Sequence, residues 1–127
     1  MPHYMMKADK EHDLYVEWST IVDAPVKWGT WEEMAADPET RPHYFRERKD
    51  WIDEHGTSVQ GRIGSYPFEG SWEDSVLIAN MGDLRFYTLQ RDRLYDFLVE
   101  LSQVQPPTPR SEQTALDKYA TPHEYED

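Results

Sequence analysis

The sequence contains no cysteine, which excludes disulfide bonds and thiolate chemistry within the chain. It also lacks an apolar run near the roughly 18 residues that a membrane-spanning helix needs. The opening residues, MPHYMMKADKEHD, lack the apolar centre of a secretory signal peptide. We therefore expect a cytoplasmic protein without a membrane partner.

Basic residues are scarce relative to acidic ones. The 127 residues include 13 Lys and Arg against 25 Asp and Glu, which gives a formal net charge of −12. Such a chain is poorly suited to a nucleic-acid backbone, where protein cations replace condensed counterions. We expect no direct nucleic-acid partner, while another protein with a basic surface is compatible with this charge.

Catalytic and cofactor motifs are missing as well. The sequence has no G-x-S-x-G, no phosphate-binding loop and no G-x-G-x-x-G. Glu47, Asp50 and Glu54 share a face of a predicted helix, but Arg46 and Lys49 are interleaved, as is typical of a solvated helix. No two histidines have the spacing of a shared helical metal site: His3, His12, His43, His55 and His123. We expect no cofactor and no metal, and we keep an enzyme with a dispersed carboxylate and histidine site as an alternative.

Aromatic residues, in contrast, are plentiful, at 13% of the chain. The stretch DLYVEWSTIV alternates, which places Leu14, Val16 and Trp18 on the buried face of a strand and Tyr15 and Ile21 on the other face. The segment DAP then breaks the strand. GTWEEM begins a short helix, because a threonine followed three residues later by a glutamate has the spacing of a capping box.

The remaining periodicities predict a helix over 42–55, a strand over 57–63, a hairpin over 75–90 and a final amphipathic helix over 91–104. The predicted order is β-α-α-β-β-β-α. We expect an α+β fold: an antiparallel sheet of about four strands with two to three helices packed on one face.

A proline cluster, QPPTP, marks the predicted boundary of the folded part. Proline fixes φ and removes a backbone donor, so neither a helix nor a sheet is expected to continue through it. Residues 1–105 are predicted to form a single α+β domain. Residues 106–127 are predicted to form a Pro-rich linker and a disordered acidic tail.

DLYVEWSTIVDAPVKWGTWEEM, together with the closing LRFYTLQRDRLYDFLVEL, resembles small uncharacterised proteins of actinobacteria and their phages. The resemblance covers residues 13–104 and depends on a strand with a tryptophan, a Pro-Gly loop and an acidic helix start. It implies a small accessory protein of the phage type. It carries over no catalytic residue.

The tryptophans outside the core suggest a binding surface. We expect Trp18 in the core, whereas Trp28 and Trp31 either clamp a loop or present an aromatic patch, and tryptophan is frequent among residues that dominate protein interfaces. The predicted partner-binding residues are aromatic anchors with an acidic rim: Trp28, Trp31, Tyr66, Phe68, Trp72, Glu32, Glu33, Glu69, Glu73 and Asp74.

These observations predict a small acidic accessory protein that binds another protein and modulates or inhibits it. One alternative is a DNA mimic that inhibits a nucleic-acid-binding protein, with rows of acids spaced like phosphates. Another is a structural homo-oligomer or virion component, in which Tyr15 and Ile21 pair with a second copy. The sequence leaves monomer and homodimer open.

Overall fold

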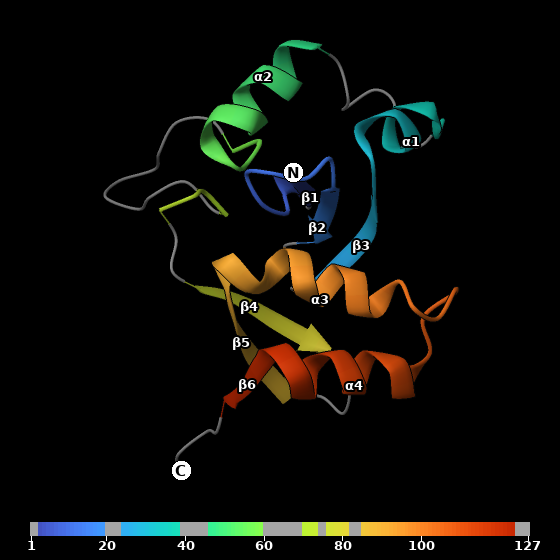
Figure 1. The fold of residues 1–127 in the computed structure, drawn as a ribbon. Coiled ribbons are helices and arrows are strands. Elements are labelled where there is room, and N and C mark those ends of the chain that lie inside the picture. The colour runs from blue at the N-terminus through green and yellow to red at the C-terminus, as the bar shows by residue number, and fades with distance from the viewer. Residues whose placement is uncertain are drawn as a thin grey trace.

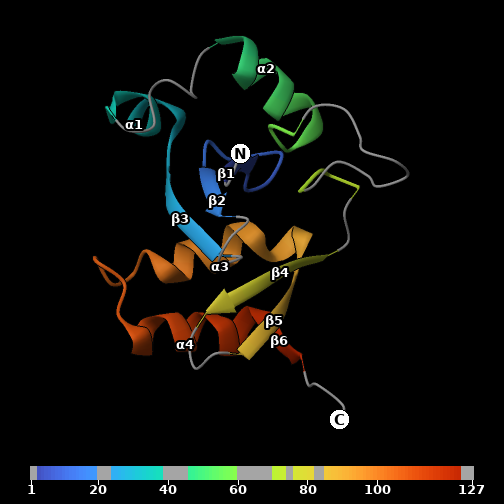
Figure 2. The same ribbon diagram turned by 180° about the vertical axis from the view of Figure 1, so that it is seen from behind.

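The computed structural model describes residues 3–19, 24–38, 46–59, 70–73, 76–81 and 85–123. This part of the chain forms two antiparallel three-stranded sheets and four α-helices, which confirms the α+β class. The strands that were expected in one sheet of about four are thus divided between two sheets (Figures 1 and 2).

The first sheet contains β1 (His3–Lys7), β2 (Tyr15–Ser19) and β3 (Ala24–Gly29) in that order. The outer edge of β1 is covered, because Met6 bridges Thr57 and the Ser58 N–H donates to the Met5 carbonyl at 2.8 Å. β3 was not predicted, because Pro25 was read as a strand break. Proline is tolerated at a sheet edge, and β3 is such an edge, with a register shift in its pairing to β2.

The second sheet contains β4 (Val76–Met81), β5 (Arg85–Gln90) and β6 (Ala120–His123). β4 and β5 form the predicted hairpin, and its turn lies outside the described residues. The strand predicted over 57–63 is described only as far as residue 59, where Thr57 forms its bridge to β1.

Helices α1 (Trp31–Ala36) and α2 (Arg46–His55) pack on the same face of the first sheet. The predicted capping box is present, since the Thr30 hydroxyl accepts from the Glu33 N–H at 3.1 Å and the Glu33 carboxylate accepts from the Thr30 N–H at 2.9 Å. Residues 42–45 of the predicted second helix lie outside the described residues.

Helix α3 (Leu94–Leu101) follows a 3-10 turn, η2 (Arg91–Arg93), and crosses the middle of the molecule beside α4 (Pro109–Tyr119) (Figure 1). The amphipathic helix predicted over 91–104 has an apolar stripe of five residues, and four of them are fully buried: Leu94, Phe97, Leu98 and Leu101. Val104, the fifth, lies beyond the helix and is 41% exposed.

The segment predicted as a disordered tail instead contains α4 and β6, and this prediction was wrong for 109–123. Pro109 occupies the first turn of α4, where its missing N–H removes no helical bond, and the Thr108 hydroxyl caps the helix by accepting from the Ser111 N–H at 3.1 Å. Ala115 and Leu116 are fully buried. Because these two residues are the buried apolar part of α4, the hydrophobic periodicity of the sequence gave little indication of a helix there. Residues 124–127 lie outside the described residues.

Both faces of β2 are covered. Val16 and Trp18 belong to a large apolar cluster shared with the second sheet, α3 and α4, whereas Tyr15 belongs to a smaller cluster under α1 and α2. Trp18 is 2% exposed, as predicted, but Tyr15 is only 1% exposed. The burial of Tyr15 contradicts the alternative in which this side chain pairs with a second copy, and Ile21 lies outside the described residues.

Candidate functional site

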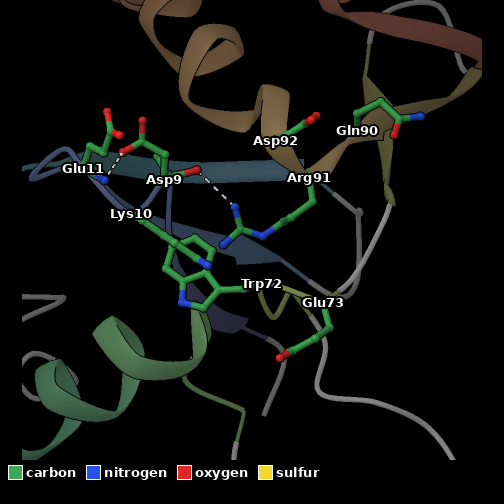
Figure 3. A pocket seen from close by; sticks show the side chains of 9 residues that line it. Asp9, Lys10, Glu11, Trp72, Glu73, Gln90, Arg91 and Asp92 are labelled. Atoms are coloured by element: carbon green, nitrogen blue, oxygen red, sulfur yellow. Dashed lines mark hydrogen bonds between the residues drawn. The ribbon is translucent and has the colours of Figure 1, made fainter.

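A cavity of about 630 Å³ lies where three separate segments of the chain meet (Figure 3). Its volume is in the range of typical ligand sites, about 300–1,000 Å³. The β1–β2 connection forms one side, residues 72–73 form another, and the end of β5 with η2 forms the third. The lining residues are Ala8, Asp9, Lys10, Glu11, Trp72, Glu73, Gln90, Arg91 and Asp92.

The Trp72 ring is held in place from the side of α2. Its backbone N–H donates to the His55 carbonyl at 3.0 Å, and its indole Nε1 donates to the Asp53 carbonyl at 3.4 Å. Gly56, at φ +84°, lies against the ring, and a Cβ atom there would come within 2.8 Å of it. The absence of a side chain at Gly56 thus allows the close approach that fixes this wall of the cavity.

Arg91 forms the back of the cavity and joins its segments. The guanidinium donates to the carbonyl oxygens of Gly70 at 2.8 Å, Ala8 at 3.1 Å, Lys7 at 2.6 Å and Gly56 at 3.1 Å. The side chain is 4% exposed, and its Cζ lies 4.8 Å from the Trp72 ring centroid. A planar guanidinium with five N–H donors is suited to binding several carbonyl oxygens at once. These four hydrogen bonds hold the Arg91 side chain beside the Trp72 ring.

The β1–β2 connection is shaped by Asp9. Its carboxylate accepts from the backbone N–H of Glu11 at 3.1 Å and of His12 at 2.7 Å, and its other oxygen lies 2.7 Å from His12 Nδ1. Burial acts to raise the pKa of Asp9, but these hydrogen bonds outweigh it and hold the pKa below 3.8. The His12 ring stacks on Tyr95 of α3 at 4.0 Å, so this loop is attached to the helix.

The cavity is lined by more acids than bases. Its four carboxylates are Asp9, Glu11, Glu73 and Asp92, and its two bases are Lys10 and Arg91, which gives a formal charge of −2. The Lys10 ammonium lies 5.6 Å from the Trp72 ring centroid, within cation–π range. Negative charge beside an aromatic ring favours a cationic ligand.

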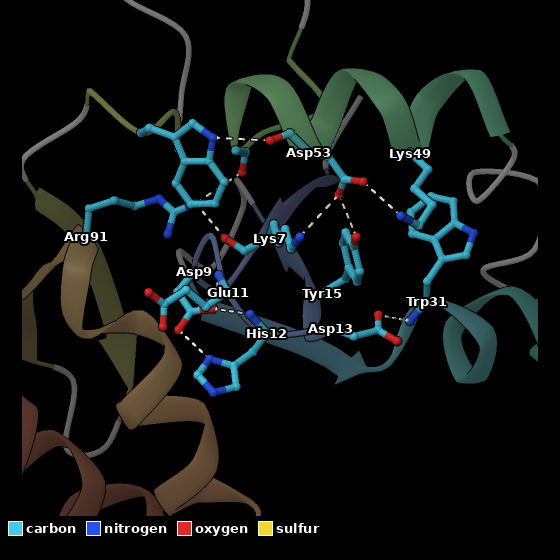
Figure 4. A network of polar contacts seen from close by, with 12 residues as sticks. Lys7, Asp9, Glu11, His12, Asp13, Tyr15, Trp31, Lys49, Asp53 and Arg91 are labelled. Carbon is cyan, nitrogen blue, oxygen red and sulfur yellow. Dashed lines mark hydrogen bonds and ion pairs between the residues drawn. The ribbon is translucent and has the colours of Figure 1, made fainter.

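A second polar network fixes α2 on the first sheet (Figure 4). The Tyr15 hydroxyl donates to Asp53 at 2.5 Å, Lys49 donates to the same carboxylate at 2.8 Å, and the Lys7 ammonium lies 3.6 Å from it. Burial acts to raise the pKa of Asp53, but the Lys49 and Tyr15 hydrogen bonds and the Lys7 charge hold it below 3.8. Burial, and then the bond to Asp53, raise the pKa of Tyr15 above 10.

Of the predicted partner-binding residues, Trp72 and Glu73 line the cavity. Trp28 is half-buried, and its Nε1 donates to the Ser102 hydroxyl at 2.7 Å. Trp31 is also half-buried and lies edge-on to the Tyr15 ring. Glu32 and Glu33 lie on the first turn of α1. The remaining predicted residues lie outside the described part of the chain: Tyr66, Phe68, Glu69 and Asp74.

The lining residues that sequence reasoning missed come from two places. Asp9, Lys10 and Glu11 lie in a stretch that was read as a terminus, because β1 before it was not recognised. Arg91 and Asp92 begin the helix predicted over 91–104 and were not selected as site residues. No periodicity in the sequence indicates that Arg91 points inward, since its partners are backbone carbonyls of three distant segments.

In the described ranges, no group of three or more His, Asp or Glu side chains is placed to hold a metal ion. The described helices include none that is long and apolar enough to cross a membrane. Comparisons with protein families, with curated proteins and with solved structures gave no match.

Proposed function

We propose that this protein acts by binding another protein, and that the cavity beside Trp72 is its contact surface. The observation that carries the proposal is a tryptophan ring fixed in a cavity with four carboxylates around it. Aromatic anchors in partly enclosed positions supply much of the affinity of protein interfaces. Carboxylates around such an anchor speed encounter with a basic partner and disfavour acidic ones.

Two features of the site support a preformed contact surface. Arg91 binds four backbone carbonyl oxygens of three chain segments around Trp72, so the ring and the cavity wall do not need to be ordered when a partner arrives. Glu11 and Glu73 are exposed, as residues of an interface rim are. In this proposal the protein is an accessory factor, of the phage type and cytoplasmic, that modulates or inhibits its partner.

A DNA mimic that inhibits a nucleic-acid-binding protein is a broader version of the same idea. The two proposals differ in which carboxylates contribute to partner binding. A mimic uses acids distributed over a surface, so carboxylates far from the cavity would contribute to affinity as much as those around it. A contact surface at the cavity concentrates this contribution around Trp72.

The test is affinity capture from bacterial lysate with quantitative mass spectrometry. The full chain is compared with Glu11→Lys/Glu73→Lys, which reverses two charges at the cavity, and with Glu54→Lys/Asp117→Lys, which reverses two exposed charges elsewhere. We expect a salt-sensitive partner to be retained by the full chain and by the second variant, and to be lost from the first.

The two double variants have the same net charge, so a difference between them reports position. Equal loss from both would overturn the cavity as the contact surface and favour a distributed acidic face. Equal retention by both, or no protein enriched over a blank matrix at any salt concentration, would overturn the proposal.

A further inference from the structure

The two cations beside Trp72 differ in how they are held. Arg91 is buried and fixed by four carbonyl oxygens. Lys10 is exposed, and in the described part of the chain its ammonium forms no ion pair and has the Trp72 ring as its contact. Figure 3 shows the Lys10 side chain lying along the Trp72 ring. The Arg91 guanidinium is therefore part of the framework, while the Lys10 ammonium lies on the ring at the end of a flexible side chain.

The backbone that carries Lys10 is fixed even though its side chain is not. Asp9 accepts the N–H groups of Glu11 and His12, which flank Lys10 on its C-terminal side, and the Ala8 N–H donates to the Leu14 carbonyl at 2.8 Å. The Lys10 Cα is thus held at the edge of the cavity. Rotation about the side-chain bonds alone can take the ammonium away from the ring.

The position of the Lys10 ammonium indicates which ligand the cavity accepts. Carboxylates lie on both sides of Lys10 in sequence, at Asp9 and Glu11, yet its ammonium is placed over the aromatic ring. A guanidinium or an ammonium from another molecule would meet the same ring and the same net negative charge. Arginine is the better fit, because its planar group also stacks on aromatic faces.

We propose that the cavity receives an arginine or lysine side chain of the partner protein against Trp72, and that Lys10 occupies this position until the partner displaces it. The inference rests on the proposed function and names the group that enters the site. Lys10 then acts as an internal competitor. Displacement moves the ammonium of this exposed lysine from the ring into bulk water, where it is well solvated, so the cost of displacing it is low.

The first experiment measures binding of defined probes to the full chain. The probes are blocked tripeptides, Ac-Gly-Arg-Gly-NH2 and its lysine and citrulline counterparts, and the signal is the indole N–H resonance of Trp72 in ¹⁵N NMR. The chain has five tryptophans, and Trp72→Phe identifies the resonance. We expect the arginine and lysine peptides to shift it, and the neutral citrulline peptide to leave it unchanged.

The second experiment removes the competitor. Lys10→Ala is expected to tighten binding of the arginine peptide about two- to fivefold, which corresponds to one exposed cation–π contact. The matched control is Lys118→Ala, which removes another exposed lysine, whose partner is Glu100 on α3. It changes the net charge by the same amount and is expected to leave the peptide affinity unchanged.

Each outcome separates this inference from the proposed function. Weaker or unchanged arginine-peptide binding by Lys10→Ala would overturn the competitor role of Lys10. Equal shifts with arginine and citrulline peptides, or none with either in both proteins, would overturn the cation site. The proposed function would still stand if the cavity variant alone lost its partner in the capture experiment.

Discussion

Helices α2 and α3 are of similar length but are attached to their sheets by different chemistry. α3, with the sequence LYDFLVEL, buries four apolar side chains completely. α2, with the sequence RERKDWIDEH, has two apolar residues, of which Ile52 is fully buried. The position of α2 is fixed by hydrogen bonds. The Asp53 carboxylate accepts from the Tyr15 hydroxyl, the Asp53 carbonyl accepts from the Trp72 indole, and the Trp51 indole donates to the Val59 carbonyl.

The difference follows from what each sequence can bury. A helix with a continuous apolar stripe is stabilised by removing that stripe from water, and it needs no particular partner atom. A highly charged helix has to satisfy its polar groups in specific directions, because unpaired charge is costly away from water. The cavity lies on the α2 side of the molecule, where such directional contacts hold Trp72 and Arg91.

The largest effect is expected in α3. Phe97→Ala should lower the free energy of unfolding by about 3–5 kcal/mol, because it leaves a void in the large apolar cluster. Urea denaturation measures the change. Val99→Ala, an exposed position on the same helix, should change stability by less than about 0.5 kcal/mol. Similar values for the two variants would contradict apolar docking of α3.

A somewhat smaller effect is expected at Arg91. Arg91→Ala should cost about 2–4 kcal/mol, because four carbonyl oxygens, three of them in buried hydrogen bonds, lose their charged donor. Arg91→Lys should recover only part of this stability, since an ammonium cannot reproduce the geometry of the fork. A lysine variant as stable as the wild type would show that charge alone is sufficient. The control is Arg93→Ala, an exposed position in the same turn.

The smallest effect is expected in the network that attaches α2. Tyr15→Phe removes the hydroxyl that donates to Asp53 and should cost about 1–2 kcal/mol at pH 7. Denaturation of the two proteins at matched conditions measures it. A larger loss than that of Phe97→Ala would reverse the comparison between the two helices.

The same network has a defined pH dependence. The pKa of Asp53 is lowered on folding, so its contribution is present above about pH 4 and is lost as pH falls through the native pKa. The pKa of Tyr15 is raised, so its contribution is present below pH 10 and declines above it, by up to about 1.4 kcal/mol per pH unit. Asp53→Asn should remove the acid limb and only reduce the alkaline one, because burial still raises the pKa of Tyr15, whereas Asp50→Asn, at an exposed position, should change neither.

Prediction from the sequence succeeded where the residues of a single helix or hairpin form a recognisable local pattern. The capping box at Thr30 and Glu33, the hairpin and the stripe of α3 are local patterns, and each is present. It failed where a short element is stabilised by distant residues. β1 has five residues and is fixed by β2 and by the backbone of residues 56–58, and α4 is fixed by the apolar cluster that it completes.

The candidate site was predicted only in part for the same reason. Trp72 and Glu73 were selected as an aromatic residue with an adjacent acid in a turn-rich stretch, a local feature. Asp9, Glu11 and Asp92 belong to the cavity because two other segments of the chain lie beside that stretch. No spacing in the sequence relates these three segments.

The sequence by itself determined the α+β class, the negative charge and the amphipathic helix of residues 94–101, because these depend on composition and on residues a few positions apart. The tertiary structure alone decided that Tyr15 is buried, that residues 109–123 are folded, and that Arg91 binds carbonyl oxygens of three distant segments beside Trp72. These features depend on contacts between segments up to 84 positions apart. Bringing such segments together costs chain entropy, and this cost is offset only when the whole core forms.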